Sequence, residues 1–282
     1  MDTNYQSVIE ANIALHSKMS NDYSTCEPHF RVENIENVEA KLKPVFEQTQ
    51  AKKMLDLGCG TGFVINIAKK YVAEIHGVDV TQAMMDKVDR TGNAKIELFN
   101  HDTGSFEAAA GTYDVVTAYS FLHHLYDVVP TLKTAYGALR SGGVFYADLD
   151  PNYYFWEGVN KLDRKGTYDE IVKREIEMVT YKDEDIEKNF GVEKDIFNSA
   201  EYGKNIKGGF RAGELEVALQ EIGFKKINFF YHWFIGQGKL INDETYPKEE
   251  RFRYAGIMDQ YLQKALPLSR NLFKYIGFTA EK

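Results

Sequence analysis

A glycine-rich turn directly after an apolar run is the feature that most constrains what this chain can fold into. The run MLDLGCGTGF, residues 54–63, places Gly58, Gly60 and Gly62 immediately after an apolar stretch. Glycine adopts backbone conformations closed to other residues and lets a ligand lie against the main chain. A strand that enters such a loop and continues into a helix is a common frame for a small-molecule site. The loop therefore predicts a ligand site at the end of a strand.

Short β-rich segments alternate with helical patterns from residue 53 onward. Apolar residues recur between them at i, i+3, i+4, i+7 spacing, which is typical of helices packed on one face. The predicted strands are Lys53–Gly58, Glu74–Val80, Lys95–Asp102, Tyr113–Tyr119 and Gly142–Asp150. This alternation predicts parallel βαβ units, with helices on both faces of the sheet and the ligand at the carboxyl ends of the strands.

Two segments interrupt this rhythm and suggest how the chain is organised. Residues 151–208 are charged and aromatic, with a helix predicted at Tyr168–Thr180, and residues 235–271 form a second break with a helix predicted at Glu249–Leu266. The predicted division is an N-terminal helical lid at 1–52, a ligand-binding core at 53–150, a helical cap insertion at 151–208, a continuation of the core at 209–234, a second cap insertion at 235–271 and a last core strand at 272–282.

Composition narrows the class of protein. The chain has 282 residues, 44% of them hydrophobic, which is enough to bury a substantial core. Its net charge is −8 and no segment is dense in Lys and Arg, which argues against a nucleic-acid partner. No apolar run approaches the roughly 20 residues of a membrane span. The polar N-terminus does not resemble a signal peptide, and Cys26 and Cys59 are interpreted as free thiols, so a cytoplasmic location is predicted.

Spacing limits which ligand the glycine loop holds. Dinucleotide enzymes use G-x-G-x-x-G, whereas this chain has G-x-G-x-G, and the Gly-Lys-Ser/Thr ending of a phosphate loop is missing. Asp79 ends the second strand about 20 residues further on, where a carboxylate can accept both hydroxyls of a ribose. Asp102, at the end of the third strand, is placed to accept from an adenine amino group. The alternatives are an exposed turn residue for Asp79 and a helix cap for Asp102.

The motifs LDLGCGTG, GVDVTQAM, HDTGSF and GALRSGGVFYADLD, in this order and spacing, resemble the class I S-adenosylmethionine-dependent methyltransferases. The likeness covers about Lys53–Asp150. It implies an α/β fold: a Rossmann-like, doubly wound, seven-stranded, mostly parallel sheet. Its last strand is antiparallel, a place that Ile276–Lys282 can take. It also implies S-adenosylmethionine as the cofactor and S-adenosylhomocysteine as its product.

The resemblance also implies a cofactor site, residue by residue. The methionine part of the cofactor is expected to be lined by Asp56, Gly58, Cys59 and Gly60. The ribose and adenine are expected to be held by Asp79, Val80 and Met84. The adenine edge is expected to meet Asp102 and Thr103. Tyr23, Phe63 and Ser120 complete the expected cofactor contacts.

The residues after the fourth strand bear on the acceptor. Methyltransferases of nucleobase amines carry an Asn/Asp-Pro-Pro-aromatic motif there, and protein-arginine enzymes carry a paired-glutamate loop, but this chain has Ser120-Phe121-Leu122-His123. Ser120 also stands where a Mg²⁺-dependent catechol type needs an Asp, so no metal is predicted. The acceptor is expected to be a small molecule, apolar or aromatic, with oxygen favoured over nitrogen or carbon.

Two adjacent histidines are the candidate catalytic residues. We expect His123 to face the substrate, as a general base or an orienting group, and His124 to pack or cap a helix. Aromatic residues in the two insertions are expected to form a cap around the acceptor; the substrate-binding candidates are His123, Tyr153, Trp156, His232 and Trp233. An ordinary subdomain core or a dimer surface is the alternative for these insertions, and a homodimer stays open.

The sequence therefore predicts a methyltransferase that moves a methyl group from S-adenosylmethionine to a small-molecule acceptor. Two alternatives remain. One is an enzyme that uses the same cofactor, or a derivative of it, for a non-methyl transfer or a rearrangement. The other is a non-catalytic protein that only binds the cofactor.

Overall fold

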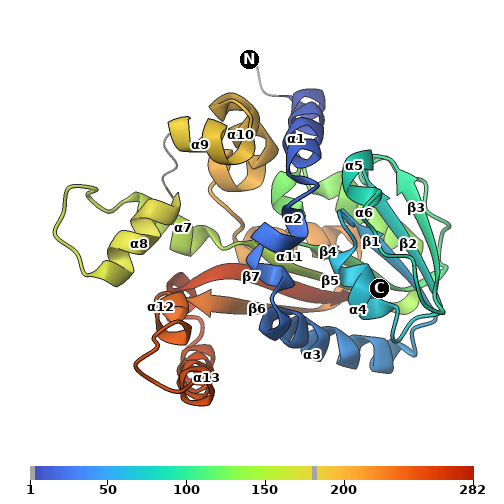
Figure 1. The fold of residues 1–282 in the computed structure, drawn as a ribbon. Coiled ribbons are helices and arrows are strands. Elements are labelled where there is room, and N and C mark those ends of the chain that lie inside the picture. The colour runs from blue at the N-terminus through green and yellow to red at the C-terminus, as the bar shows by residue number, and fades with distance from the viewer. Residues whose placement is uncertain (1–3, 180–182) are drawn as a thin grey trace.

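A seven-stranded sheet organises the computed structural model, which describes residues 4–179 and 183–282. The strands are β1 (Lys53–Leu57), β2 (Glu74–Asp79), β3 (Lys95–Asn100), β4 (Tyr113–Tyr119), β5 (Leu139–Pro151), β6 (Lys225–Phe234) and β7 (Phe273–Glu281). Their order is β3-β2-β1-β4-β5-β7-β6, and β7 runs antiparallel to both of its neighbours (Figure 1). The predicted doubly wound sheet with an antiparallel last strand is confirmed.

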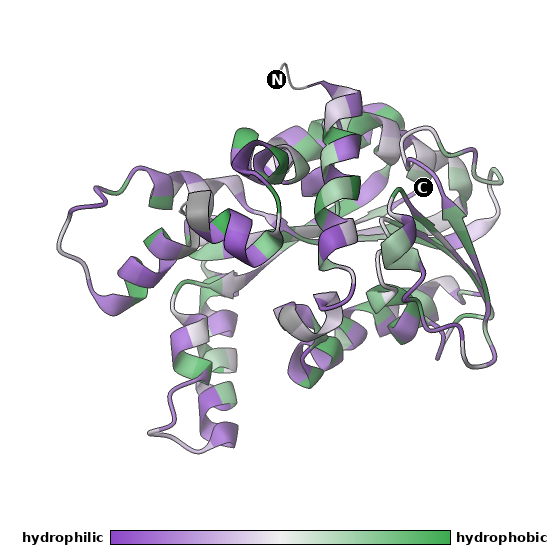
Figure 2. Cartoon of the chain, turned by 45° about the horizontal axis from the view of Figure 1, so that its top comes forward, coloured by the Kyte–Doolittle hydropathy of each residue, from purple (hydrophilic) through white to green (hydrophobic). Residues whose placement is uncertain are grey.

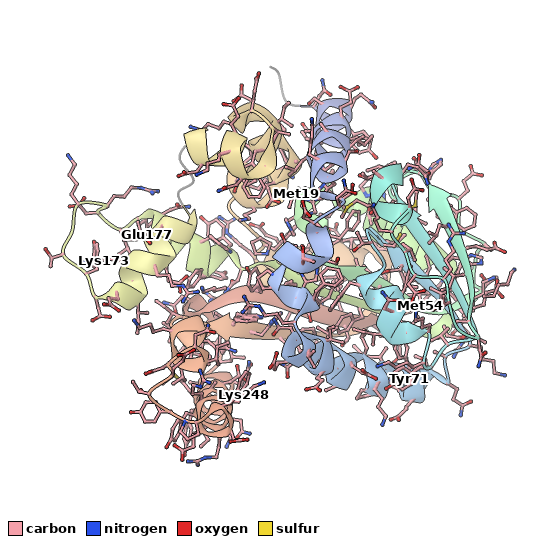
Figure 3. All side chains as sticks on the ribbon, in the orientation of Figure 1. Met19, Met54, Tyr71, Lys173, Glu177 and Lys248 are labelled. Carbon is pink, nitrogen blue, oxygen red and sulfur yellow. The ribbon has the colours of Figure 1, made fainter. Side chains whose placement is uncertain are left out.

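Helices cover both faces of this sheet and give two apolar cores. Helices α3 (Val32–Thr49) and α4 (Phe63–Ala68) pack on one face, and α6 (Val129–Ala138) and α11 (Ala212–Ile222) pack on the other. Successive strand residues point to opposite faces. Within β1, Met54 therefore belongs to the α3–α4 core (Figure 3), and Leu55 belongs to the α6–α11 core.

The N-terminal region begins near the carboxyl ends of the parallel strands and continues into α3, which packs on one face of the sheet. Helix α1 (Tyr5–Met19) begins with a capping box in which Asn4 and Ser7 satisfy each other's backbone N–H groups. The short α2 (Tyr23–Cys26) and the 3₁₀ turn η1 (Pro28–Phe30) then lead into α3. Elements of four and three residues are too short to show a helical period, so periodicity in the sequence does not reveal them.

The two insertions are mostly helical, as predicted. The first contains α7 (Tyr153–Asn160), α8 (Glu170–Val179), α9 (Asp183–Phe190), α10 (Lys194–Ala200) and the short π-helical segment η3 (Tyr202–Ile206). The second contains α12 (Gln237–Ile241), α13 (Lys248–Lys264) and the 3₁₀ turn η4 (Arg270–Leu272). Thr180, the predicted end of the helix observed as α8, lies outside the described residues.

The insertions contact each other beside the sheet. Lys239 of α12 forms an ion pair with Glu170 of α8. Ile235 packs against the cluster that contains Trp156. In Figure 1, α7, α8, α12 and α13 lie together beyond the end of the sheet, whereas α9 and α10 lie next to α1. Between residue 4 and residue 282, with 180–182 left aside, no helix is long and apolar enough to cross a membrane.

Candidate functional site

A cavity at the carboxyl ends of β1, β2 and β4 brings the predicted cofactor residues together. The short helices α5 (Gln82–Met85) and η2 (Leu122–His124) contribute to its wall. All twelve residues expected to contact the cofactor line this one cavity: Tyr23, Asp56, Gly58, Cys59, Gly60, Phe63, Asp79, Val80, Met84, Asp102, Thr103 and Ser120. Their roles toward a cofactor remain predictions, but their convergence on one wall is a property of the fold.

The glycine loop forms the floor of the cavity. The backbone N–H groups of Gly58 and Cys59 donate to the carbonyl oxygen of Val78, at 2.8 and 3.1 Å, which ties the loop to the end of β2. Gly58 has φ +73°, and a Cβ there would lie 2.0 Å from the ring of Phe121, so only glycine fits. Gly60 has φ +50°, and a Cβ would meet nothing closer than Met84, at 3.7 Å. The main chain at Gly60 is therefore open to a ligand.

Asp79 holds the loop and still faces the cavity. Its Oδ2 accepts the backbone N–H of Gly60 at 2.9 Å, and its Oδ1 accepts that of Thr81 at 2.8 Å. Burial raises the pKa of Asp79, and these two hydrogen bonds work against that rise. Each carboxylate oxygen has a second lone pair, so both can also accept from a pair of hydroxyl groups.

Asp102 has the capping role that the sequence left open for it. Its Oδ2 accepts the backbone N–H of Ser105 at 3.0 Å and the Ser105 hydroxyl at 2.8 Å. The same oxygen accepts the hydroxyl of Tyr5 at 2.5 Å, which ties α1 to the end of β3. Burial and the neighbouring Asp102 carboxylate raise the pKa of Tyr5. These hydrogen bonds do not test the expected contact between Asp102 and an adenine edge, which stays a prediction.

Asp56 is the most deeply buried carboxyl on the cavity wall, at 2% exposure. Burial raises its pKa to about 7, although the hydroxyl of Thr117, which donates to Oδ1 at 2.6 Å, lowers it. The nearby Asp79 charge also raises it. Burial disfavours the ionised form of this carboxyl, so a cation placed beside Asp56 would stabilise the carboxylate and lower its pKa.

The chemistry of this wall fits S-adenosylmethionine. Carboxyl groups stand at three places along the cavity, at Asp56, Asp79 and Asp102, and an open stretch of main chain lies between the first two. The rings of Phe63 and Tyr119 pack together on the same wall, with centroids 4.8 Å apart. Carboxylates and aromatic faces suit the positive sulfonium and ammonium groups of that cofactor, and Asp79 suits its ribose.

The structure reverses the expected positions of the two histidines. His124 lines the cavity, whereas His123 is not among its lining residues and is 6% exposed. The backbone N–H and Nδ1 of His123 lie 3.0 and 2.9 Å from Oδ1 of Asp150. Burial lowers the pKa of His123 to about 4. Both residues sit in the 3₁₀ turn η2, where neighbouring side chains point in different directions, and the first one turns inward.

A bulge in β5 supplies the carboxylate that holds His123. Residues two apart in a strand normally share a face, but Leu149 has φ +64° and the register with β7 shifts between Ala147 and Asp150. Asp150 therefore bonds His123, whereas Asp148 bonds Lys41 of α3 at 3.1 Å.

His124 has a defined orientation and tautomer. Its Nδ1 lies 2.8 Å from the carbonyl oxygen of Ala200 in α10. A carbonyl only accepts, so Nδ1 carries the proton and Nε2 keeps its lone pair. The ring of His16, from α1, packs edge-on against His124 at 4.8 Å between centroids. Burial, and then the neighbouring His123, lower the pKa of His124 well below its usual value. His124 is therefore a neutral base at pH 7.

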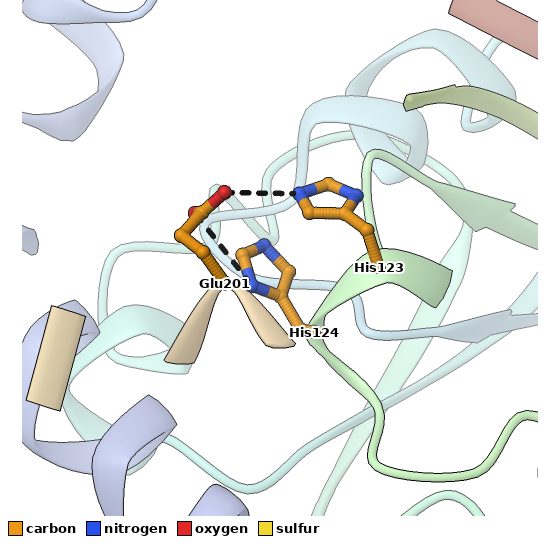
Figure 4. Close-up of side chains that lie close together, drawn as sticks. All are labelled: His123, His124 and Glu201. Carbon is orange, nitrogen blue, oxygen red and sulfur yellow. Dashed lines mark ion pairs between the residues drawn. The ribbon is translucent and has the colours of Figure 1, made fainter. Parts of the chain in front are cut away.

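Glu201 lies beside both histidine rings (Figure 4). Its carboxylate oxygens are 3.9 Å from Nε2 of His123 and 3.9 Å from Nδ1 of His124. One ligand atom from each of the three residues lies within 4.8 Å of the other two, which is close enough to consider a metal ion. However, Nζ of Lys204 lies 3.2 Å from Oε2 of Glu201 and already neutralises it. Burial would raise the pKa of Glu201, but Lys204 and the histidines lower it.

The other substrate-binding candidates do not reach this cavity. Trp156 is 6% exposed and packs inside the first insertion. The guanidinium of Arg211 stacks on the ring of Tyr153 at 3.4 Å. Nε2 of His232 bonds Asp148, on the sheet face that α3 covers. Trp233 follows His232 on β6 with φ +59° and is also absent from the cavity wall. The side chains of these four residues build the insertions and the far edge of the sheet, and their contact with a substrate stays a prediction.

The predicted cap stays a prediction. The insertions contact each other, and none of their described residues lines this cavity. The first insertion acts one layer behind the wall: Ala200 orients His124, and Gly203 lies so close that a Cβ there would be 2.8 Å from Cα of His123.

Helix α1, which lies within the predicted N-terminal lid, supplies lining residues that the sequence analysis did not name. One stripe of it lines the cavity: Tyr5, Val8, Ile9, Asn12 and His16. The amide nitrogen of Asn12 donates to the backbone oxygen of His124 at 3.0 Å, so the helix is fixed to the candidate base. The spacing i, i+3, i+4, i+7 and i+11, with Asn12 and His16 inside an otherwise apolar stripe, is the signal that could have identified it.

Comparisons with known proteins agree with this geometry. Residues 55–145 match the family described as "Methyltransferase domain". A ubiquinone biosynthesis O-methyltransferase of Aromatoleum aromaticum is 28% identical over 138 residues, which is 43% of this chain and 56% of that protein. The enzyme of the same name from Vibrio parahaemolyticus is 29% identical over 130 residues, 42% of this chain and 55% of that protein. The chain spans a little over half of the length of these relatives.

Solved structures support the fold alone. A SAM-dependent methyltransferase from Archaeoglobus fulgidus has a TM-score of 0.52 and 16% identity, and the alignment covers 88% of this chain and 94% of that one. Phosphoethanolamine N-methyltransferase 2 of Haemonchus contortus, solved with phosphomonomethylethanolamine and S-adenosylhomocysteine, has a TM-score of 0.54 and 12% identity, over 99% of this chain and 60% of that one. Residues 55–145 therefore match a methyltransferase domain, and the seven-stranded sheet has the fold of solved S-adenosylmethionine-dependent methyltransferases.

Proposed function

We propose that this protein transfers a methyl group from S-adenosylmethionine to a hydroxyl oxygen of a small, largely apolar acceptor. The observation that carries the proposal is the shared wall: the twelve candidate cofactor residues and His124, whose Nε2 keeps its lone pair, line one cavity. The matched domain and the curated relatives, which are named as O-methyltransferases, support the same reaction.

The cofactor would lie along the glycine loop. Asp79 would accept the ribose hydroxyls, because it stands at the end of β2 with two lone pairs to spare. Asp56 and the open main chain at Gly60 would hold the methionine end, and Asp102 and Thr103 the adenine edge. A side chain at position 58 would clash with the ring of Phe121, so the glycine keeps this part of the loop bare.

His124 would take the proton from the acceptor hydroxyl. When bound, S-adenosylmethionine supplies an electrophilic methyl group on a positive sulfur. The chain's part is to hold the acceptor oxygen in line with that group and to remove its proton, since alignment accounts for much of the acceleration in such displacements. Ala200 keeps Nδ1 of His124 protonated, so Nε2 is the atom that accepts.

The wall from α1 would select the acceptor. Val8 and Ile9 are apolar, and Tyr5 and Asn12 add polar atoms at separate points along the stripe. A mostly apolar wall with few polar groups is typical of a site for a drug-sized organic molecule. The side chain of Asn12 already bonds His124, so the acceptor would be placed between the helix and the base.

Product analysis tests this function. The protein would be incubated with methyl-labelled S-adenosylmethionine and a panel of phenols, aliphatic alcohols and amines, and mass spectrometry would follow S-adenosylhomocysteine and the acceptor. The proposal predicts label on the oxygen of a phenol or alcohol. Label only on amines would refute oxygen transfer, a larger added group would indicate a non-methyl transfer, and cofactor binding with no product from any acceptor would favour a binding protein.

A further inference from the structure

Helix α13 of the second insertion has two apolar faces, of which the described chain covers only one. Its inner face includes Ala255 and Leu262, which pack against β6 and α12. Gln263 anchors that face by donating to the backbone oxygen of Tyr231 at 2.6 Å. In Figures 1 and 2 the helix lies at the periphery of the molecule, so its other side borders solvent.

The outer face is apolar and regularly spaced. Tyr254, Ile257, Met258 and Tyr261 are 36%, 42%, 49% and 71% exposed. They lie at positions i, i+3, i+4 and i+7, which places them on one side of a helix. Tyr246, 46% exposed, extends this face, because its ring lies 6.0 Å from that of Tyr254. We call these five residues the α13 patch.

Charged residues border the α13 patch at its two ends, and the N-terminal end carries both signs, since the guanidinium of Arg253 lies 4.8 Å from the ring of Tyr254. Glu250 is exposed near the N-terminal end, where its carboxylate lies 3.4 Å from the hydroxyl of Tyr254. Lys264 closes the helix, with its ammonium 5.7 Å from the ring of Tyr261. The two charges are separated by about four turns, so they lie along the same side of the helix as the patch.

This arrangement is self-complementary under a two-fold axis. If a second α13 packs antiparallel, with the axis between Ile257 and Met258, Tyr254 meets Tyr261 of the second copy, and Glu250 comes within one residue of the position that faces Lys264 of the second copy at both ends. A parallel pair would instead bring identical charges together. An isologous contact of this kind closes at two subunits.

We propose that the α13 patch is the interface of a homodimer, formed by antiparallel packing of α13 against α13 of a second copy. Half-exposed side chains of this size each present on the order of 100 Å², so the patch and the stems of its flanking charged residues approach the roughly 800 Å² per partner of a stable interface. The chain's net charge of −8 favours this occupant over an anionic membrane.

Sedimentation velocity on the full chain tests the dimer. The wild type should be dimeric at about 10 µM, within the range of ordinary dimer affinities. Tyr261→Glu should raise the dissociation constant at least about 100-fold, because it places two carboxylates in an apolar contact. Val217→Glu is the matched control: Val217 is 53% exposed on α11, outside the patch, and this variant should dimerise like the wild type. Melting curves would establish that both variants fold.

A charge exchange tests the antiparallel register. Glu250→Lys should weaken the dimer about tenfold, and the double variant Glu250→Lys with Lys264→Glu should restore it. A monomeric wild type at about 100 µM would overturn the proposal. So would a dimer that Tyr261→Glu leaves intact, equal disruption by Val217→Glu, or binding of the monomer to anionic vesicles through Tyr261.

Discussion

Nδ1 of His124 lies 2.8 Å from the carbonyl oxygen of Ala200, across 76 residues of sequence. The contact joins the turn after β4 to the last helix of the first insertion. Because the carbonyl accepts, Nδ1 of His124 carries the proton, and Nε2 of this cavity-lining residue keeps its lone pair. The first insertion thus orients His124 through Ala200, and none of its described residues lines the cavity.

Removing His124 should impair turnover more than stability. His124→Ala is expected to lower kcat about 10²–10⁴-fold, the usual contribution of a general base, with little change in the affinity for S-adenosylhomocysteine. His101→Ala is the matched control, because His101 is exposed and does not line the cavity. Steady-state kinetics and a melting curve would distinguish the two. A normal kcat in His124→Ala would show that another group, or water, takes the proton.

His123 should appear in the pH dependence of stability. Its pKa of about 4 in the folded protein lies below the ordinary value of about 6.5, because burial disfavours the charged ring. The unfolded chain therefore binds this proton first, and stability is lost as pH falls from about 6.5 toward 4, by up to about 3 kcal/mol. Urea unfolding at pH 7 and pH 4.5 would measure the loss, which should shrink in His123→Gln. An unchanged loss in that variant would assign it to other groups.

Asp56 should make cofactor binding release a proton. Its pKa of about 7 means that the carboxyl is half protonated at neutral pH, and a bound cation would lower that pKa. S-adenosylmethionine should therefore bind more tightly as pH rises from about 6 to 8. Calorimetry in buffers of different ionisation enthalpy would measure the released proton. Asp56→Asn should abolish the release, and a wild type that releases none at pH 7 would place the cation elsewhere.

The close contact at Gly203 provides a test of the first insertion. Gly203→Ala should push η3 away from His123, because the new methyl group would lie 2.8 Å from backbone atoms, and kcat should fall at least about tenfold as His124 loses its orientation. Gly213→Ala is the control, since nothing lies within 4 Å of a Cβ on that helical residue. Kinetics on both variants would decide. Equal activity would mean that the insertion does not position the histidines.

The core of the site could be predicted from local sequence. Each of its parts is a short motif at the end of a strand: the glycine loop after β1, Asp79 at the end of β2, Asp102 after β3. Parallel strands bring these ends to one edge of the sheet, so their convergence follows from the alternation of strands and helices. The observed β5 begins three residues before the predicted strand Gly142–Asp150 and ends one residue after it, as expected for element ends.

What could not be predicted depends on contacts between distant segments. The direction of each histidine is set by Asp150 and Ala200, which lie 27 and 76 residues away from their partners. The bulge at Leu149 that turns Asp150 toward His123 leaves no periodic signal. Aromatic composition alone does not distinguish an acceptor cap from a local apolar core, and Trp156 is buried in such a core.

Calorimetric titration with S-adenosylhomocysteine tests most directly whether the cavity between the glycine loop and Asp79 is the cofactor site. The wild type should bind at micromolar strength, about −8 kcal/mol. Asp79→Ala should weaken binding by about 1.5–3 kcal/mol, as for lost hydrogen bonds to a charged acceptor. Asp86→Ala, at an exposed position outside the cavity wall, should bind like the wild type. Tight binding of NADH with no binding of S-adenosylhomocysteine, or equal affinity in the Asp79 variant, would contradict this assignment.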